Sequence, residues 1–236
     1  MSNIRLFFSE SLSLNFESKL NKLQSHYLAK VMRIKVGENF SLFNSNGEWL
    51  AKIKEISKGI IEFIVIEKLR QKSIDQEIWL AFSPIKSNYF NFMIQKSTEL
   101  GVTRFIPIIF DRTIVRKINK ERLEKIIVEA TEQSNRINVP LLEKPKKLKD
   151  FLSINSKKID LVFTDLNSSK KKLEINKESN KPLCAIVGPE GDFSEKEREL
   201  IVNFKSVRSI NINQNILRAE TATISIISII SYILNL

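Results

Sequence analysis

Short segments of alternating apolar and polar residues fill the first third of the chain. Within residues 48–56, Trp49, Ala51 and Ile53 fall on every second position, which places them on one face of a predicted strand. A hairpin turn signal, Asn46-Gly47, precedes this segment. The other elements predicted here are strands over Arg5–Phe8, Asn39–Phe43 and Gly59–Ile66, and a helix over Ser25–Arg33. Several short strands joined by tight turns indicate a small β-barrel or a curled sheet.

After a polar stretch at Lys68–Gln76 the pattern changes to alternating strands and helices. We interpret this stretch as the link between two domains, 1–72 and 73–236. The predicted strands are Ile78–Phe82, Phe105–Phe110, Asp160–Phe163, Leu183–Val187 and Val207–Ile212. The predicted helices are Phe90–Leu100, Glu121–Ser134, and two that begin after Ser194 and Arg218. Such alternation predicts an α/β fold with a parallel sheet and helices on both of its faces.

The chain ends in an isoleucine-rich segment, Ile224–Leu236. It has 13 residues, too few for the roughly 20 that a membrane-spanning helix needs, so we expect no membrane partner. Ser225, Ser228 and Ser231 recur at every third position along the segment. This spacing predicts a buried helix whose stripe of small residues allows another segment to pack closely against it.

The net charge bears on the function more than any other bulk property. Among 236 residues, 38 are Lys or Arg and 27 are Asp or Glu, which gives a formal charge of +11. A globular protein this basic usually binds a polyanion such as RNA, although lysine also serves simply to keep a surface soluble. The single cysteine, Cys184, lies in an apolar run and fits a buried thiol in a reducing, cytoplasmic location. With only Cys184 and one histidine, His26, we expect no metal site.

Two stretches near the C-terminus carry the candidate chemistry. In the first, Ala185–Ser194, an apolar run ends in a glycine-containing turn, and Ser194 with Glu197 has the spacing of a helix-capping box. A strand, a tight loop and a helix are therefore predicted, and the glycines let backbone amides approach a ligand closely. The second stretch, Asn215–Ala222, is another turn that leads into a helix. Two such loops at strand ends of an α/β pattern predict a binding crevice.

Together, and in this order, the two stretches resemble the SPOUT methyltransferases, and among them the RsmE family. That family methylates N3 of a uridine in small-subunit (16S) ribosomal RNA and carries Gly-Pro-Glu-Gly-Gly-Phe-Ser-x-x-Glu, then Ile-Leu-Arg-x-Glu-Thr-Ala. The matching residues are Gly188–Glu197 and Ile216–Ala222, and the resemblance extends to Gln95–Gly101 and Glu129–Ser134. It implies a PUA-like RNA-binding β-barrel domain, a SPOUT domain with a C-terminal trefoil knot, and a homodimer that pairs through the C-terminal helix.

The resemblance also implies S-adenosylmethionine as the cofactor. Its adenine ring and sulfonium group require backbone hydrogen bonds, apolar walls and little side-chain bulk, which the two loops offer. Thr221 has two compatible interpretations, as a hydroxyl donor to the cofactor and as a helix-start residue. The residues expected to bind the cofactor are Thr164, Leu166, Val187, Gly188, Pro189, Gly191, Ile216, Leu217, Thr221 and Ala222.

The implied reaction needs further groups that act on the base. N3 of uridine holds a proton, so it becomes a nucleophile only when that proton leaves and the resulting anion is stabilised. Arg218 is the first candidate for this stabilisation, with Arg112 and Arg136 next, and either Glu220 or Glu132 is a candidate base. The alternative for Arg218 is a structural role at a helix start. The residues expected to contact RNA are His26, Arg33, Arg112 and Arg136.

At several positions the chain departs from the family pattern. Asp192 and Asn135 stand where the family usually has glycine, and so does Asn213. Asparagine tolerates a left-handed backbone better than most residues other than glycine, so we expect Asn213 to preserve a turn of that kind. These replacements affect the roles of individual residues more than the resemblance as a whole.

Two other functions remain open on the sequence alone. A SPOUT methyltransferase of transfer RNA or of a ribose 2′-hydroxyl would share the cofactor loops but would be expected to lack the Gln95–Gly101 segment. A non-catalytic RNA-binding assembly factor would keep the basic charge without binding the cofactor. The favoured expectation is an enzyme that methylates N3 of a uridine in 16S ribosomal RNA, within the assembled 30S particle.

Overall fold

The computed structural model describes residues 4–71, 76–176 and 179–235, and the chain divides into two units. The first unit contains Met1–Ile74 together with Thr131–Val139, and the second contains Asp75–Ala130 and Pro140–Leu236. The domain boundary expected between residues 72 and 73 lies outside the described residues. The sequence did not predict that the chain returns to the first unit at Thr131 after it has begun the second.

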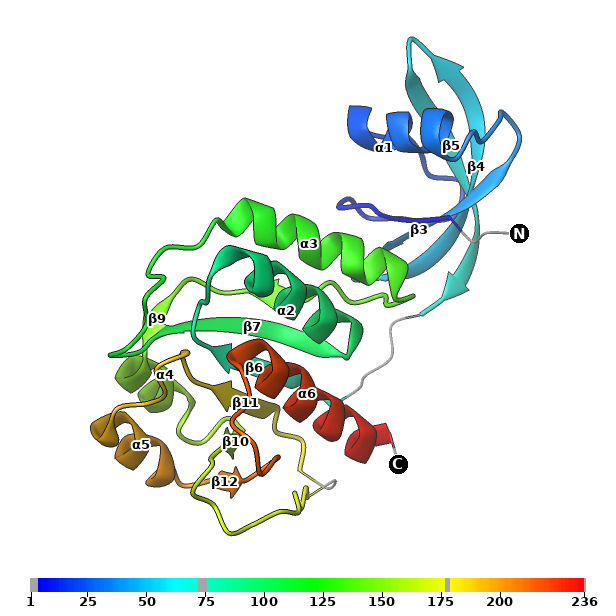
Figure 1. The fold of residues 1–236 in the computed structure, drawn as a ribbon. Coiled ribbons are helices and arrows are strands. Elements are labelled where there is room, and N and C mark those ends of the chain that lie inside the picture. Colours follow the sequence, from blue (N-terminus) through cyan, green and yellow to red (C-terminus); the bar gives the residue numbers. More distant parts are fainter. Residues whose placement is uncertain (1–3, 72–75, 177–178, 236) are drawn as a thin grey trace. The chain divides into compact units, whose positions relative to one another are not determined.

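A five-stranded sheet runs through the described part of the first unit (Figure 1). The strands are β1 (Arg5–Phe7), β2 (Glu17–Lys19), β3 (Asn39–Asn44), β4 (Gly47–Ser57) and β5 (Ile60–Arg70), in the spatial order β1-β3-β4-β5-β2. β1 pairs with β3 in parallel, and the other neighbours pair antiparallel. The predicted hairpin is confirmed, but its turn is Ser45-Asn46, one residue before the predicted Asn46-Gly47, and Gly47 begins β4.

Phenylalanine rings fill the core of the first unit. Phe63 on β5 lies edge-on to Phe8 and Phe40, with ring centroids 5.3 and 6.0 Å away. Such edge-to-face pairs add to the stabilisation that burial of the rings provides. The alternation predicted for β4 is confirmed, since Ala51 and Ile53 are buried in this core and the residue between them is exposed.

The helix of the first unit differs from its predicted range, Ser25–Arg33. It begins earlier, as α1 (Lys22–His26), where the side chain of Asn21 accepts a hydrogen bond from the backbone N–H of Gln24 and caps the first turn. It then widens into a short π-helix, η1 (Tyr27–Val31). The apolar pattern had suggested one regular helix, and spacing alone does not reveal a change from α to π hydrogen bonding.

The polar link was predicted to begin too early. Strand β5 continues past Lys68 to Arg70, and these residues remain paired with β4. Glu67 and Lys68 are exposed to solvent, so their polarity marks an exposed stretch of strand rather than a linker. The rest of the predicted link, residues 72–75, lies outside the described residues.

A parallel sheet forms the centre of the second unit. Its strands run in the order β12-β10-β11-β6-β7-β8, and β9 pairs with β7. In chain order they are β6 (Ile78–Phe82), β7 (Val102–Ile109), β8 (Leu141–Leu142), β9 (Lys146–Lys147), β10 (Asp160–Thr164), β11 (Leu183–Val187) and β12 (Val207–Ile210). Each of these pairings is parallel, which confirms the predicted α/β fold. Consequently these strands end at one common edge of the sheet.

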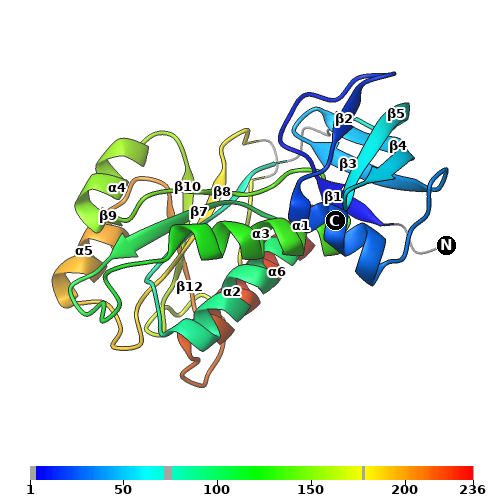
Figure 2. The same cartoon turned by 90° about the horizontal axis from the view of Figure 1, so that it is seen from above.

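Helices cover both faces of this sheet, as predicted (Figure 2). α4 (Leu148–Asn155) and α5 (Glu195–Val202) lie on one face, and α2 (Ser87–Glu99) and α6 (Ala219–Asn235) lie on the other. A further helix, α3 (Lys120–Gln133), begins in the second unit and ends within the residues assigned to the first. The sequence did not predict α4, whose eight residues give too short an apolar pattern to recognise.

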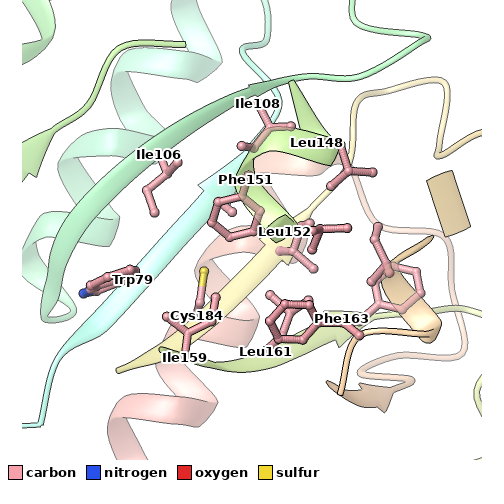
Figure 3. Packing of buried hydrophobic residues seen from close by; sticks show 14 of the residues in the cluster. Trp79, Ile106, Ile108, Leu148, Phe151, Leu152, Ile159, Leu161, Phe163 and Cys184 are labelled. Atoms are coloured by element: carbon pink, nitrogen blue, oxygen red, sulfur yellow. The ribbon is translucent and has the colours of Figure 1, made fainter. Parts of the chain in front are cut away.

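The core beneath α4 and α5 consists of large apolar side chains (Figure 3). Phe151 and Leu152 of α4 pack with Ile106 and Leu161 of the strands in one buried cluster. Cys184 belongs to the same cluster, and its complete burial raises the pKa of its thiol far above the ordinary value. The prediction of a buried cysteine is therefore confirmed.

The C-terminal helix α6 is buried on one face only. Ile226, Ile227 and Ile230 are fully buried against the rest of the second unit. Ser228, the middle residue of the predicted small-residue stripe, is exposed. The prediction of a buried helix therefore holds for one face of α6 in the single chain, while the stripe residue Ser228 lies on the exposed side.

Candidate functional site

A cavity of about 620 Å³ opens in the second unit, and its lining comes mainly from segments that follow the parallel strands. Residues after β10, β11 and β12 contribute to its wall, together with the start of α2 and the start of α6. This is the place where ligands bind in open α/β sheets. The lining residues are Ile85, Lys86, Tyr89, Ile114, Thr164–Leu166, Val187–Glu190, Asp192, Phe193, Asn211–Asn213 and Asn215–Glu220, with Ala222.

The loop after β11 is held by a contact between Gly188 and a phenylalanine ring. A Cβ atom at Gly188 would lie 2.7 Å from the ring of Phe193, closer than real Cβ contacts allow. That ring is fixed in turn, because it lies edge-on to Phe110 and Phe163 at centroid distances of 5.1 and 5.2 Å. Glycine at position 188 is therefore a condition for this shape of the cavity wall.

The capping box predicted at the start of α5 is confirmed. The side chain of Ser194 accepts the Glu197 backbone N–H, and the Glu197 carboxylate accepts the Ser194 backbone N–H. Glu197 also accepts the backbone N–H of Asp111 at 2.8 Å, while the Ser194 hydroxyl donates to the Asp111 carboxylate at 2.7 Å. The box thus fixes the loop after β11 to the loop after β7.

Asp192 occupies a backbone conformation that favours glycine. Its φ angle is +61°, in the left-handed region, and Asp is one of the residues that tolerate this region. Its side chain accepts the backbone N–H of Phe193 at 2.8 Å, and its own N–H donates to the carbonyl of Pro189 at 3.0 Å. The replacement of glycine therefore leaves the turn intact.

The loop after β10 contains a buried carboxylate that sequence reasoning missed. Asp165 accepts hydrogen bonds from Arg198 at 2.6 Å and from the backbone N–H of Asn167 at 2.8 Å. The amide of Asn211 then donates to the carbonyl of Leu166 at 3.0 Å, which ties this wall to the segment after β12. The only signal in the sequence was that Asp165 lies between two expected cofactor residues at a strand end.

The segment between β12 and α6 is built from successive asparagine turns. The side chain of Asn211 accepts the backbone N–H of Asn213 at 3.1 Å, and that of Asn213 accepts the N–H of Asn215 at 2.8 Å. Asn213 does not have a positive φ angle, so the prediction of a left-handed backbone there is wrong. Its side chain shapes the turn instead. Ile216 follows with 86% of its surface exposed, at the edge of the cavity.

Both predicted catalytic residues, Arg218 and Glu220, line the cavity. The carbonyl of Arg218 accepts the Ala222 N–H at 2.8 Å, so its backbone begins α6. The guanidinium is exposed, and its carbon lies 5.7 Å from the centre of the Tyr89 ring. Within the described chain, neither Arg218 nor Glu220 forms an ion pair or a side-chain hydrogen bond.

Eight of the ten predicted cofactor residues lie in the cavity wall. They are Thr164, Leu166, Val187, Gly188, Pro189, Ile216, Leu217 and Ala222. Gly191 and Thr221 are not part of that wall. The carbonyl of Gly191 accepts a hydrogen bond of 2.8 Å from the guanidinium of Arg112, and Thr221 is exposed on α6.

Three of the four predicted RNA contacts belong to the first unit. His26 and Arg33 are exposed there, at the end of α1 and just after η1, and Arg136 follows α3. The fourth, Arg112, belongs to the second unit and is exposed. Glu132, the alternative base, also belongs to the first unit, where its carboxylate accepts the backbone N–H of Phe7 at 2.8 Å.

A buried ion network holds residues 131–136 within the first unit. Glu48 is only 2% exposed and pairs with Arg5 at 2.9 Å and with Arg70. Arg5 also donates to the carbonyls of Glu132 and Arg136, each at 2.9 Å, so it satisfies acceptors at the end of α3. Burial alone would raise the pKa of the Glu48 carboxyl, but the hydrogen bonds from the two arginines outweigh it and hold the pKa below its usual value.

Residues 4–71, 76–176 and 179–235 show neither a cluster of metal ligands nor a membrane-spanning helix. No group of three or more His, Cys, Asp or Glu side chains there is arranged to hold a metal ion. No helix within those residues is long and apolar enough to cross a bilayer.

Comparison with known proteins points to one family over the whole chain. Residues 72–231 match the profile of an RNA methyltransferase domain, and residues 20–66 match that of an RNA methyltransferase PUA domain. The ribosomal RNA small subunit methyltransferase E of Rickettsia conorii is 35% identical over 95% of this chain and 93% of its own. The protein of the same name from Aquifex aeolicus is 30% identical over 85% of this chain and 88% of its own.

A solved structure gives the same result at the level of the fold. The ribosomal RNA small subunit methyltransferase E of Neisseria gonorrhoeae, determined bound to S-adenosyl methionine, superposes with a TM-score of 0.86. It is 26% identical, and the match covers 97% of each chain. The likeness therefore includes both units and is not limited to the cofactor loops.

Proposed function

The chain belongs to the ribosomal RNA small subunit methyltransferase E family, and on that premise we propose that it methylates N3 of one uridine in 16S ribosomal RNA. The methyl donor is S-adenosylmethionine, and the substrate is the assembled 30S particle. The observation that carries the proposal is that the two sequence motifs line one and the same cavity, with Arg218 and Glu220 in its wall.

The cavity suits the proposed cofactor in size and in chemistry. Its volume of about 620 Å³ falls within the range of roughly 300–1,000 Å³ that is usual for small-molecule sites. Leu166, Ile216 and Leu217 offer apolar walls for an adenine ring, and the loop at Gly188 offers backbone groups without a Cβ. When bound, the cofactor supplies an electrophilic methyl group on a sulfonium.

Arg218 and Glu220 have complementary roles in the proposed reaction. The Arg218 guanidinium donates hydrogen bonds to a carbonyl oxygen of the uracil and stabilises the negative charge that develops as N3 loses its proton. Glu220 lies in the same wall and accepts that proton. Within the described chain neither side chain forms an ion pair, so no ion pair has to be broken before the two bind the base.

The RNA is held mainly by positive charge outside the cavity. His26, Arg33 and Arg136 of the first unit and Arg112 of the second contact the ribosomal RNA backbone. Since each phosphate contact releases counterions, binding should weaken steeply as salt is added. N3 lies on the pairing edge of uracil, so the target base must be unpaired or flipped out before it enters the cavity.

The test is methyl transfer from labelled S-adenosylmethionine to purified 30S particles, followed by nucleoside mass spectrometry. We expect N3-methyluridine in 16S RNA, with little transfer to protein-free RNA. A label on a ribose, on another base or on transfer RNA would instead identify a different SPOUT activity. Cofactor binding without transfer to any of these substrates would favour an RNA-binding assembly factor.

The family resemblance further implies a homodimer and a trefoil knot, and the single cysteine fits a cytoplasmic location; all three stay predictions. For the dimer, the exposed position of Ser228 on α6 gives a direct test. Ser228→Arg should shift the sedimentation coefficient of the protein from dimer to monomer without changing its far-ultraviolet circular dichroism. A monomer at micromolar concentration in the unmodified protein would contradict the prediction.

A further inference from the structure

An aromatic ring lies beside the candidate catalytic arginine. Tyr89 belongs to the first turn of α2, lines the cavity and is 52% exposed. The guanidinium carbon of Arg218 lies 5.7 Å from the centre of its ring, within the roughly 6 Å over which a cation–π attraction acts. Among the described residues, the Tyr89 ring is the partner that attracts the Arg218 guanidinium electrostatically.

Buried neighbours on α2 hold the backbone that carries the Tyr89 ring. The next residue, Phe90, is buried, and its ring packs on Phe82 of β6 with centroids 5.6 Å apart. Ile94, one turn further along α2, is fully buried. α2 and α6 lie side by side in both views of the fold (Figures 1 and 2), so Tyr89 and Arg218 extend from two packed helix starts. The position of the Tyr89 backbone is therefore fixed relative to that of Arg218.

We propose that Tyr89 is a positioning residue that holds the Arg218 guanidinium at the cavity wall for its encounter with the uracil. This inference rests on the role proposed above for Arg218. An exposed arginine has several rotatable bonds, and each hydrogen bond it makes to substrate must first overcome that freedom. The aromatic face restricts the guanidinium without occupying its N–H groups, so these donors remain available to the base.

The same helix carries a matched pair that lies outside the cavity wall. Phe92 is 47% exposed, and the ammonium group of Lys96 lies 5.7 Å from the centre of its ring. Neither Phe92 nor Lys96 lines the cavity. A change at Phe92 therefore removes an equivalent cation–π contact from α2 and leaves the proposed site unaltered.

The experiment measures single-turnover methylation of 30S particles by Tyr89→Leu, Tyr89→Phe, Arg218→Ala and the double variant Tyr89→Leu/Arg218→Ala. Tyr89→Leu should lower the rate about two- to fivefold, the factor that corresponds to an exposed cation–π contact. Tyr89→Phe keeps the aromatic face and should retain the full rate. The dissociation constant for S-adenosylmethionine, measured by calorimetry, should stay unchanged, and so should the rate of the control Phe92→Leu.

The double variant decides between positioning and direct contact. If Tyr89 acts through Arg218, Tyr89→Leu has no further effect once Arg218 is alanine. An equal loss in both backgrounds would overturn the inference, because Tyr89 would then contact the substrate itself. A loss in Tyr89→Phe would also overturn it, since the hydroxyl and not the ring face would matter. An Arg218→Ala enzyme with the full rate would refute the proposed role of Arg218 itself, a result distinct from failure of Tyr89 alone.

Discussion

One set of charged side chains in the first unit and one in the second are used in opposite ways. In the first unit, Arg5 and Arg70 converge on the buried carboxylate of Glu48 and on backbone carbonyls after α3. In the second unit, Arg218 and Glu220 lie in the cavity wall, and neither has an ion pair with the described residues. Charged side chains that pair with one another inside the protein stabilise its fold. Charged side chains that line a cavity without an ion pair can act on a substrate. For these residues, the presence or absence of an ion pair thus distinguishes a structural role from the proposed catalytic one.

The largest effect should come from the buried network. Glu48→Gln removes the negative charge that Arg5 and Arg70 share, and breaking a buried pair in this way costs about 3–5 kcal/mol of unfolding free energy. Urea unfolding followed by circular dichroism measures the loss. The matched control is Glu17→Gln, which breaks an exposed pair with Lys54 and should cost about 1 kcal/mol or less. Equal losses in the two variants would contradict the contrast between the regions.

Acid should weaken the same network. The pKa of Glu48 is lower in the folded protein than its ordinary value of 4.5, so the folded state binds the proton more weakly than the unfolded state. Its stabilising contribution is therefore fully present above that ordinary value and is lost as the pH falls through the depressed folded one. Between pH 7 and pH 3 the urea midpoint should fall further for the unmodified protein than for Glu48→Gln. Parallel falls would show that Glu48 does not carry the effect.

At the cavity, a comparable change is expected in the activation free energy of methylation and not in the free energy of unfolding. Arg218→Ala should lower the methylation rate by about 10²–10³-fold, the usual cost of removing one donor that stabilises a developing anion. The thermal midpoint and the cofactor dissociation constant should stay unchanged, because the side chain is exposed and forms no ion pair with the described residues. Arg122→Ala, an exposed arginine on α3, serves as the control and should keep the rate at saturating substrate.

A steric change should have an intermediate effect. Gly188→Ala places a Cβ about 2.7 Å from the Phe193 ring, so the ring or the loop must move. Overpacking of this kind costs about 1–3 kcal/mol, and we expect a weaker affinity for S-adenosylmethionine in calorimetry. At Gly191 an added Cβ would lie 3.5 Å from Arg112, an ordinary contact. Gly191→Ala should therefore bind the cofactor normally, and a loss there equal to that at Gly188 would refute this account.

The smallest effects should come from one left-handed residue in each unit. Asn135 and Asp192 both have φ angles of +61°, and both stand where the family pattern has glycine. Asn135→Gly and Asp192→Gly relieve backbone strain but also remove side-chain acceptors, for Arg70 and for the Phe193 N–H respectively. We expect each to change the unfolding free energy by less than about 1 kcal/mol. A larger loss would mean that the hydrogen bond to the side chain contributes more to stability than relief of the backbone strain does.

The sequence predicted the second unit well because its signals are local. Apolar runs such as Leu183–Val187 mark buried parallel strands, and the Ser194–Glu197 spacing marks a helix start. Both cavity loops could be identified in the same way. The family resemblance supplied Thr164 and Leu166, which lie in the cavity wall as expected.

Features that depend on distant partners could not be predicted. Tyr89 and Asn211 line the cavity because segments far apart in the chain pack together there, and neither residue belongs to a recognisable motif. Glu48 looks like an ordinary polar residue of an alternating strand, and only its arginine partners explain why it is buried. Charge placement of this kind is decided by tertiary contacts, on which residue spacing carries no information.

The return of Thr131–Val139 to the first unit bears on how this architecture could evolve or be divided. A cut at the link near residue 72 would separate Arg5 and Arg70 from the carbonyls of Glu132, Asn135 and Arg136 that they serve. Each fragment would then carry half of a shared structural element. The N-terminal part is thus no interchangeable module. Gain, loss or exchange of the N-terminal segment would have to be accompanied by change at the end of α3, so the two parts should be inherited together.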